Sequence, residues 1–283
     1  MFRLSEKLLK NNIHIEVHSL VKVLDNNFVS CWNHTILNFI LYKNTNKEGI
    51  PIQNSKYLEF LSKFGVGGAH PGGLNLTKEL FKAENIGENP YILDVGCGTG
   101  QTAAYLAETY EAKVTGIDIN SVMVAKAKKR MKKNRLPVKI MQCSIEQVPL
   151  SDHTFDYIIS ESVLSFVNKP NALKEIFRLL KNGGRFIAIE FTIHQPLEEK
   201  IEKEIKEFYG FDSCSMKKDW VDLFNQAGFK HIRIQKNKSI FSVPELNHSE
   251  HIEPELYEVM DKHFEMILKY EGLLDYRIYS CTK

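Results

Sequence analysis

A short apolar segment that runs directly into three alternating glycines constrains this chain more than any other feature. Residues 92–100 read Ile-Leu-Asp-Val-Gly-Cys-Gly-Thr-Gly, and residues 101–109 have the pattern of a helix. Glycine permits a tight turn and lets a ligand approach the backbone closely. The N-terminus of a helix offers free N–H groups and a partial positive charge. The pattern therefore predicts a buried strand, a ligand-binding loop and a helix in succession.

Segments typical of strands and of helices alternate along the chain after about residue 75. The expected strands are 91–95, 113–117, 138–142, 155–160, 185–190, 231–235 and 276–281. The expected helices are 75–82, 101–109, 121–134, 170–180, 220–227 and 255–270. Such alternation is typical of a mostly parallel sheet with helices on both faces, so we expect a doubly wound α/β fold.

Local signals set the ends of two of these helices. Ser121 is positioned to cap the N-terminus of the helix over 121–134. The Asn-Gly-Gly sequence at 182–184 follows the helix over 170–180 and is a typical C-terminal stop.

Composition and charge exclude several classes of protein. The 283 residues carry a formal net charge of +2, which implies no polyanionic partner. No apolar run reaches the ~18 residues of a membrane span, and the N-terminal residues lack the apolar core of a signal peptide. We therefore expect a cytoplasmic protein without membrane contact.

The cysteines give no sign of a disulfide framework or a metal site. They are Cys31, Cys97, Cys143, Cys214 and Cys281, and no two form a Cys-x-x-Cys pair. An odd count without paired spacing argues against disulfides and against structural zinc. We expect reduced thiols and no metal.

An acidic residue follows the glycine loop at the spacing of an adenosine site. Asp118 lies 18 residues after Gly100, at the end of the expected strand over 113–117. An acid in this position can accept hydrogen bonds from both ribose hydroxyls. Ala103 stands where a dinucleotide fingerprint has glycine or alanine, so spacing alone leaves a dinucleotide cofactor open.

Four segments together resemble the Rossmann-like (class I) S-adenosylmethionine-dependent methyltransferases, in their small-molecule and ubiquinone-type subgroup. The matching segments are 93–100, 116–118, 155–160 and 178–184. The resemblance covers about residues 75–236, with Asn182 where the family usually has proline. It implies a seven-stranded sheet in the order 3-2-1-4-5-7-6, with the last strand antiparallel between the fifth and the sixth.

The resemblance also implies how the chain is divided. Residues 1–74 would form a helical N-terminal cap or lid region, and residues 75–283 would form the S-adenosylmethionine-binding domain. Within that domain, residues 237–272 would be an insertion between the last two strands.

The motif residues acquire roles from the same resemblance. Those that would hold the methionine part of the cofactor are Asp94, Gly96, Cys97, Gly98, Thr99 and Gly100. Asp118 would hold the ribose. Those that would flank the adenine are Ile119, Ser144 and Ile145, with Ser144 in a position where the family usually has an acid. Glu161 would lie near the cofactor and the mouth of the substrate site.

The expected chemistry is direct displacement of a methyl group from a sulfonium, whose reactivity the cofactor supplies. The protein aligns the nucleophile and keeps water out, and a hydroxyl or amine nucleophile can also need a base. The candidate bases are Glu161, Glu190, His194 and His70. For each of these side chains we prefer a structural role over a catalytic one.

A glycine-rich segment precedes the first motif. Residues 65–73 contain five glycines, and such a backbone is mobile and packs closely. One interpretation is a lid over the cofactor, with His70 and Tyr57 facing the substrate. The other is an ordinary loop that leads into the helix over 75–82.

A basic stretch allows two interpretations. Its cationic residues are Lys126, Lys128, Lys129, Arg130, Lys132, Lys133, Arg135 and Lys139. Such a patch can bind phosphates. We prefer a solvated helix face, because the same helix has its own apolar stripe.

We therefore expect transfer of a methyl group from S-adenosylmethionine to an O, N or C nucleophile of a small-molecule acceptor, leaving S-adenosylhomocysteine. An RNA or protein methyltransferase and a non-catalytic S-adenosylmethionine-binding protein are the alternatives. The expected partner is a small molecule rather than nucleic acid or a membrane, and a homodimer is left open.

Overall fold

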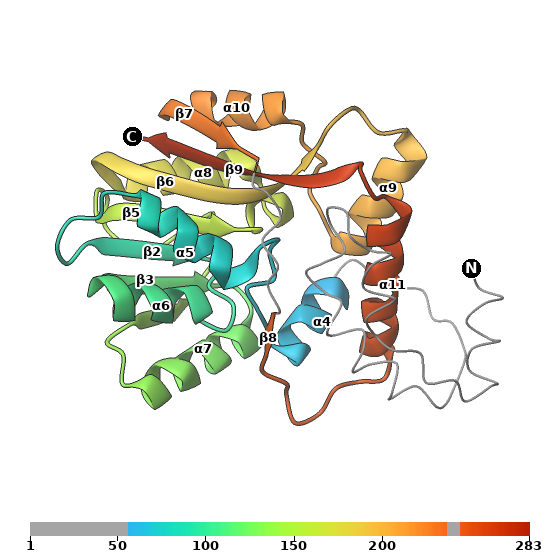
Figure 1. The fold of residues 1–283 in the computed structure, drawn as a ribbon, viewed down its shortest axis with the longest axis horizontal. Coiled ribbons are helices and arrows are strands. Elements are labelled where there is room, and N and C mark those ends of the chain that lie inside the picture. Colours follow the sequence, from blue (N-terminus) through green and yellow to red (C-terminus); the bar gives the residue numbers. More distant parts are fainter. Residues whose placement is uncertain (1–55, 237–243) are drawn as a thin grey trace.

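The computed structural model describes residues 56–236 and 244–283, and it contains a seven-stranded sheet in the order β4-β3-β2-β5-β6-β9-β7 (Figure 1). The strands are β2 (Tyr91–Val95), β3 (Lys113–Asp118), β4 (Lys139–Gln142), β5 (Phe155–Glu161), β6 (Leu180–Ile193), β7 (Lys230–Gln235) and β9 (Leu274–Thr282). Neighbouring strands from β4 to β6 are parallel, whereas β9 is antiparallel to both β6 and β7. This arrangement confirms the expected strand order and the expected antiparallel last strand.

Helices cover both faces of the sheet. The helices on one face are α5 (Gly73–Ala83), α6 (Gln101–Tyr110) and α7 (Ser121–Asn134), and those on the other are α8 (Lys169–Leu179) and α10 (Lys217–Gln226). Successive residues of a strand point to opposite faces. Ile158 of β5 accordingly joins the buried cluster under α8 and α10, and Ile159 joins the cluster under α5, α6 and α7.

A third buried cluster lies outside the sheet, in α4 (Lys56–Phe64), α9 (Glu199–Tyr209) and α11 (Glu255–Lys269). The ring of Tyr57 lies at its centre, 4.9 Å from Tyr209, 5.8 Å from Phe208 and 5.2 Å from His263 between centroids. Figure 1 shows the three helices standing together beyond the strands, on the right. We call these helices, with the two-stranded pair of β1 (Val66–Gly67) and β8 (Glu245–Leu246), the cap.

The glycine pair at 183–184 does not end a helix, contrary to the sequence prediction. Helix α8 ends at Leu179, and the following residue, Leu180, is fully buried and extended, so it already pairs with Phe155 of β5. The next pair in the register joins Tyr157 to Arg185. Residues 181–184 therefore bulge from β6, and Gly183, at φ 78°, provides the left-handed conformation that the bulge requires.

The cap of helix α7 is Asn120 rather than Ser121, which corrects the second local prediction. Asn120 has an extended backbone, and its side-chain oxygen accepts hydrogen bonds from the amides of Val122 at 2.9 Å and Met123 at 3.2 Å. Ser121 is already the first helical residue and is exposed. Asparagine was the better cap because it stands at the last extended position before the helix.

Two sequence interpretations concern residues outside the described ranges. Cys31 and most of the expected 1–74 cap region fall within residues 1–55, and the first part of the expected 237–272 insertion falls within residues 237–243. The other four cysteines are free thiols. Within the described residues, no helix has the length and apolar character needed to cross a bilayer.

We predict that Asn120→Ala lowers the free energy of unfolding by about 1 kcal/mol, because two amides of the first turn of α7 lose their acceptor. Denaturant unfolding of the cofactor-free protein measures the effect. Ser121→Ala is the matched control, and its expected effect is within about 0.5 kcal/mol. A larger loss in the Ser121 variant than in the Asn120 variant would contradict the capping assignment.

Candidate active site

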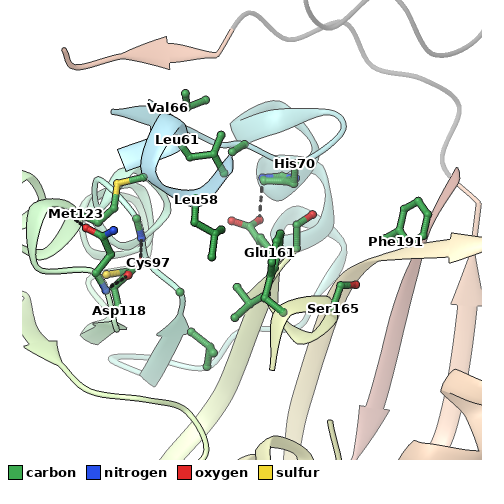
Figure 2. A pocket seen from close by; sticks show the side chains of 18 of the residues that line it. Leu58, Leu61, Val66, His70, Cys97, Asp118, Met123, Glu161, Ser165 and Phe191 are labelled. Atoms are coloured by element: carbon green, nitrogen blue, oxygen red, sulfur yellow. Dashed lines mark hydrogen bonds and ion pairs between the residues drawn. The ribbon is translucent and has the colours of Figure 1, made fainter. Parts of the chain in front are cut away.

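One cavity of about 670 Å³ opens at the carboxyl ends of the parallel strands, between the sheet and the cap (Figure 2). Its size lies within the ~300–1,000 Å³ typical of small-molecule sites. One end is lined by the glycine loop and by residues that follow β3 and β4. The other end is lined by residues of α4, α9 and α11. Ligands of open α/β sheets bind at this edge, so the fold and the cavity agree on the location of the site.

The glycine loop depends on conformations that only glycine adopts readily. Gly96, Gly98 and Gly100 have φ values of 66°, 52° and 77°. A Cβ at Gly96 would lie 2.3 Å from Val163, and a Cβ at Gly100 would lie 2.7 Å from the end of Met131. The first two glycines line the cavity, whereas Gly100 does not and acts as the N-cap of α6. Substitution at any of the three would therefore displace the loop.

Asp118 fastens the glycine loop to the next strand. Its carboxylate accepts hydrogen bonds from the Gly98 amide at 2.9 Å and from the Asn120 amide at 2.8 Å (Figure 2). Burial raises the pKa of Asp118, and these two amides oppose the rise. The neighbouring Ile119 is 70% exposed and lines the cavity, which gives the site an apolar wall beside an acidic acceptor. That pair fits a ribose next to a heterocyclic base.

Asp94 places a buried carboxylate on the cavity wall. Its side chain is 2% exposed, and its Oδ2 atom has no hydrogen-bond partner among the described residues. Burial raises the pKa of Asp94 well above its usual range, Glu161 and Asp118 raise it further, and the Ala103 amide opposes them. A cationic ligand next to Asp94 would lower this pKa and stabilise the ionised carboxylate. The ammonium group of a methionine moiety supplies such a charge, so the residues present fit the expected cofactor.

The remaining expected cofactor residues also lie on the cavity wall, namely Cys97, Thr99, Ser144 and Ile145. Burial raises the pKa of Cys97 well above its usual value, so its thiol stays protonated. The Ser144 hydroxyl accepts a hydrogen bond from the Glu146 amide at 3.1 Å, which shapes the turn after β4. All the proposed cofactor residues except Gly100 therefore line one continuous surface.

Glu161 and His70 face each other inside the cavity (Figure 2). The Glu161 carboxylate accepts hydrogen bonds from Thr77 at 2.5 Å and from Thr102 at 2.7 Å. The His70 Nε2 atom lies 3.4 Å from Glu161 Oε1, and its Nδ1 atom lies 3.3 Å from the Pro71 carbonyl oxygen. The sequence analysis missed both threonines, because nothing in their local sequence connects them to Glu161.

Glu190 does not line the cavity, and the structure gives it a structural role instead. It is fully buried and accepts hydrogen bonds from the amides of Val163 at 3.2 Å and Leu164 at 3.0 Å, and from the Ser165 hydroxyl at 3.2 Å. These contacts hold the turn after β5 against β6. Burial raises the pKa of Glu190 to about 7, against the effect of these donors and of Lys169.

His194 also lies outside the cavity lining. Its Nε2 atom is 2.9 Å from Asp275 Oδ2, and Arg277 approaches its other ring nitrogen at 3.3 Å. The side chain is partly exposed, and Asp275 separates it from the cavity wall. We therefore leave His194 out of the proposed mechanism.

The glycine-rich segment contributes β1 to the cap, and its role as a lid stays a prediction. Its strand β1 pairs with β8, and both His70 and Tyr57 line the cavity. Lys126 of α7 donates hydrogen bonds to the carbonyl oxygens of Ser62 at 2.8 Å, Lys63 at 3.1 Å and Asn247 at 2.5 Å. Desolvation on burial, followed by the charge of Lys63, lowers the pKa of Lys126.

Arg130 joins the cap to the glycine loop. Its Nε atom donates to the Thr99 carbonyl at 2.8 Å, and its Nη2 atom donates to Glu245 of β8 at 2.8 Å. Gln101, at the start of α6, donates to the other oxygen of Glu245 at 2.8 Å. Two residues of the basic stretch, Lys126 and Arg130, therefore hold α7 to the cap by hydrogen bonds. Four others are exposed, namely Lys128, Lys129, Lys132 and Lys133.

Comparisons with known proteins agree with this geometry. A family model described as a methyltransferase domain matches residues 86–228. A Bacillus subtilis protein described as the uncharacterized methyltransferase YodH is 36% identical over 238 residues, which cover 81% of this chain and 100% of that protein. Phosphoethanolamine N-methyltransferase 1 of Zea mays is 33% identical over 174 residues, or 60% of this chain and 34% of that relative.

A solved structure shows the same fold. Phosphoethanolamine N-methyltransferase 2 of Haemonchus contortus, in complex with S-adenosyl-L-methionine, superposes with a TM-score of 0.64 at 18% identity. The match covers 81% of this chain and 56% of that protein. The chain belongs to the methyltransferase-domain family. Within it, the chain is a class I methyltransferase that depends on S-adenosylmethionine. Among the described residues, no group of three or more His, Cys, Asp or Glu side chains is arranged to hold a metal ion.

We predict that Arg130→Ala weakens binding of S-adenosylhomocysteine about tenfold, because the Thr99 carbonyl and Glu245 lose a charged donor worth roughly 1.5–3 kcal/mol. Titration calorimetry measures the dissociation constant. Lys129→Ala removes the neighbouring, exposed charge from the same helix and should leave the affinity unchanged. Equal effects in both variants would show that the charge of α7 matters and the contact with the loop does not.

Glu190 gives the folded protein a pH dependence. Its pKa of about 7 in the folded state exceeds the ordinary 4.5, so the folded state binds more protons between these values. Stability should therefore fall as pH rises from about 5 to about 7, by roughly 3 kcal/mol. Glu190→Gln keeps an acceptor for the two amides and removes the ionisation. Its free energy of unfolding should vary less with pH than that of wild type, and parallel profiles would refute the assignment.

Proposed function

We propose that the protein transfers a methyl group from S-adenosylmethionine to a small-molecule acceptor bound beneath the cap. The observation that carries the proposal is one continuous cavity, in which the glycine loop lines one end and the cap lines the other. Glu161 and His70 lie where the two ends meet. Relatives named as phosphoethanolamine N-methyltransferases support a small-molecule acceptor.

We assign the cofactor residues by the fit of their chemistry. Asp118 would accept hydrogen bonds from the ribose, and Asp94 would pair with the ammonium group of the methionine moiety. Ile119 and Ile145 would enclose the adenine. The bound cofactor would supply an electrophilic methyl group on a positively charged sulfur. The chain then has to align the nucleophile with that methyl group and exclude water.

Glu161 is the base in this proposal. The hydroxyls of Thr77 and Thr102 fix both of its oxygens, so the carboxylate points into the cavity in one orientation. His70 lies beside Glu161, with its Nδ1 atom near the Pro71 carbonyl oxygen and its Nε2 atom near Glu161 Oε1, so it helps to shape the pocket around the carboxylate. Glu161 would accept the O–H or N–H proton of the acceptor as the nucleophile takes the methyl group.

The labelled-transfer experiment below also tests the two alternatives, an RNA or protein methyltransferase and a non-catalytic S-adenosylmethionine-binding protein. An RNA or protein substrate would have to reach a cavity enclosed by the cap, and two of the basic residues that supported nucleic-acid binding are engaged within the protein. A cytoplasmic location and a homodimer remain predictions from the sequence.

Labelled transfer tests the proposed function. Wild-type protein with methyl-labelled S-adenosylmethionine and host extract should put label into the small-molecule fraction. Glu161→Gln should reduce the rate by about 10²–10⁴-fold while S-adenosylhomocysteine still binds. His194→Ala, which changes a side chain outside the cavity, should retain the wild-type rate.

Label in RNA or protein would replace the proposed acceptor class. A full rate in Glu161→Gln would remove Glu161 as the base. Absence of cofactor binding by wild type would reject the methyltransferase site itself.

A further inference from the structure

We infer, on the basis of the proposed function, that the acceptor is an uncharged molecule with an apolar, ring-bearing body and one polar head group. A phosphorylated acceptor does not fit the same surface. The inference rests on the side chains that line the cavity on the two sides of Glu161.

Aromatic side chains form one wall of this acceptor end. Phe211 lies at the centre, with ring centroids 5.0 Å from Phe166, 5.0 Å from Phe191 and 5.1 Å from Tyr209. All four line the cavity, and the three phenylalanines are only partly buried. Figure 2 shows Phe191 on the side of Glu161 opposite Asp118. Rings arranged in this way offer faces and edges to another ring.

Aliphatic side chains line the cavity on the other side of Glu161, toward Asp118 (Figure 2). Leu58 and Leu61 of α4 and Val66 of β1 line the cavity, and Figure 2 shows Leu58 projecting from its helix toward Glu161. Leu58 is 39% exposed, which is unusual for a leucine within a packed cap. An apolar ligand between the aromatic wall and this leucine would remove both from water.

The polar groups of the acceptor end are engaged within the protein. The Tyr209 hydroxyl lies 3.1 Å from His263 Nδ1, and the Ser165 hydroxyl donates to Glu190. Burial lowers the pKa of His263 to about 3, so its ring is neutral. The Glu161–His70 pair is therefore the place where a head group would be recognised. A carboxylate and an imidazole next to largely apolar walls suit an acceptor with a hydroxyl or amine head group.

The charges that line this end are unfavourable for a phosphate. The ionisable lining residues include the carboxyl groups of Glu161 and Asp275. Burial raises the pKa of Asp275, and the contact with Arg277 lowers it. The pKa is lowered overall, so Asp275 stays ionised. A phosphate beside the Glu161 carboxylate would be repelled in a site of low dielectric constant. Among the described residues that line the cavity, no lysine or arginine is present to offset that repulsion. The acceptor end thus lacks the cationic side chains that would balance the phosphate group of phosphoethanolamine.

A pair of probes that differ by one phosphate tests the inference. The protein is saturated with S-adenosylhomocysteine, and binding of 2-naphthol, 2-naphthyl phosphate and O-phosphoethanolamine is measured by calorimetry. We expect 2-naphthol to bind and 2-naphthyl phosphate to bind at least about tenfold more weakly. O-phosphoethanolamine should give no measurable heat of binding.

A variant pair then locates the site. Phe191→Ala should weaken 2-naphthol binding about tenfold and leave S-adenosylhomocysteine affinity unchanged, which also shows that the variant is folded. Leu268→Ala is the matched control, because Leu268 is 55% exposed on α11 and does not line the cavity.

Tighter binding of either phosphate compound, or no binding of 2-naphthol, would overturn the inference while the methyltransferase site stands. Equal losses of 2-naphthol affinity in Phe191→Ala and Leu268→Ala would also overturn the inference. Loss of S-adenosylhomocysteine binding by wild type would instead reject the proposed function.

Discussion

The hydrogen bond from the Gly98 amide to the Asp118 carboxylate is the contact on which the site depends. It joins the loop after β2 to the end of β3, two strands that are neighbours in the parallel sheet. Parallel pairing brings their carboxyl ends to one edge, and the left-handed glycines allow the loop to turn back toward the acid. The same carboxylate also holds Asn120, the cap of α7. One acid therefore connects the glycine loop, the end of β3 and the start of α7.

A second set of contacts makes the two ends of the cavity interdependent. Arg130 binds a carbonyl of the glycine loop and the carboxylate of Glu245, while Lys126 binds three carbonyls of the cap. These cations belong to α7, the helix that Asn120 starts. The cap is thus held to the same helix that follows Asp118 in the chain. Donor and acceptor sites are physically coupled although they use different side chains.

Local chemistry made the cofactor end predictable from sequence. An apolar strand, glycines and a helix are contiguous in the chain, and Asp118 follows at a fixed spacing. The acceptor end was harder to predict, because its contacts join residues that lie far apart in the sequence. Thr77 and Glu161 are 84 residues apart, and α9 was not predicted although it has apolar residues at helical spacing. Its buried face packs against α4 and α11, which lie far away in the chain. At Ser121 and at the glycines 183–184, a local sequence signal gave a wrong prediction. The adjacent residue Asn120 caps α7, and the backbone is already extended at Leu180 before the glycines.

The late position of β8 has a consequence for how the molecule is built. The strands and helices around the glycine loop are complete before residue 245, whereas the partner of β1 and the helix α11 come after it. During synthesis from the N-terminus, the donor end can therefore assemble before the acceptor end has all of its walls. The walls of the acceptor end therefore come from segments on both sides of the glycine loop in the chain, and they are complete only once α11 has been made.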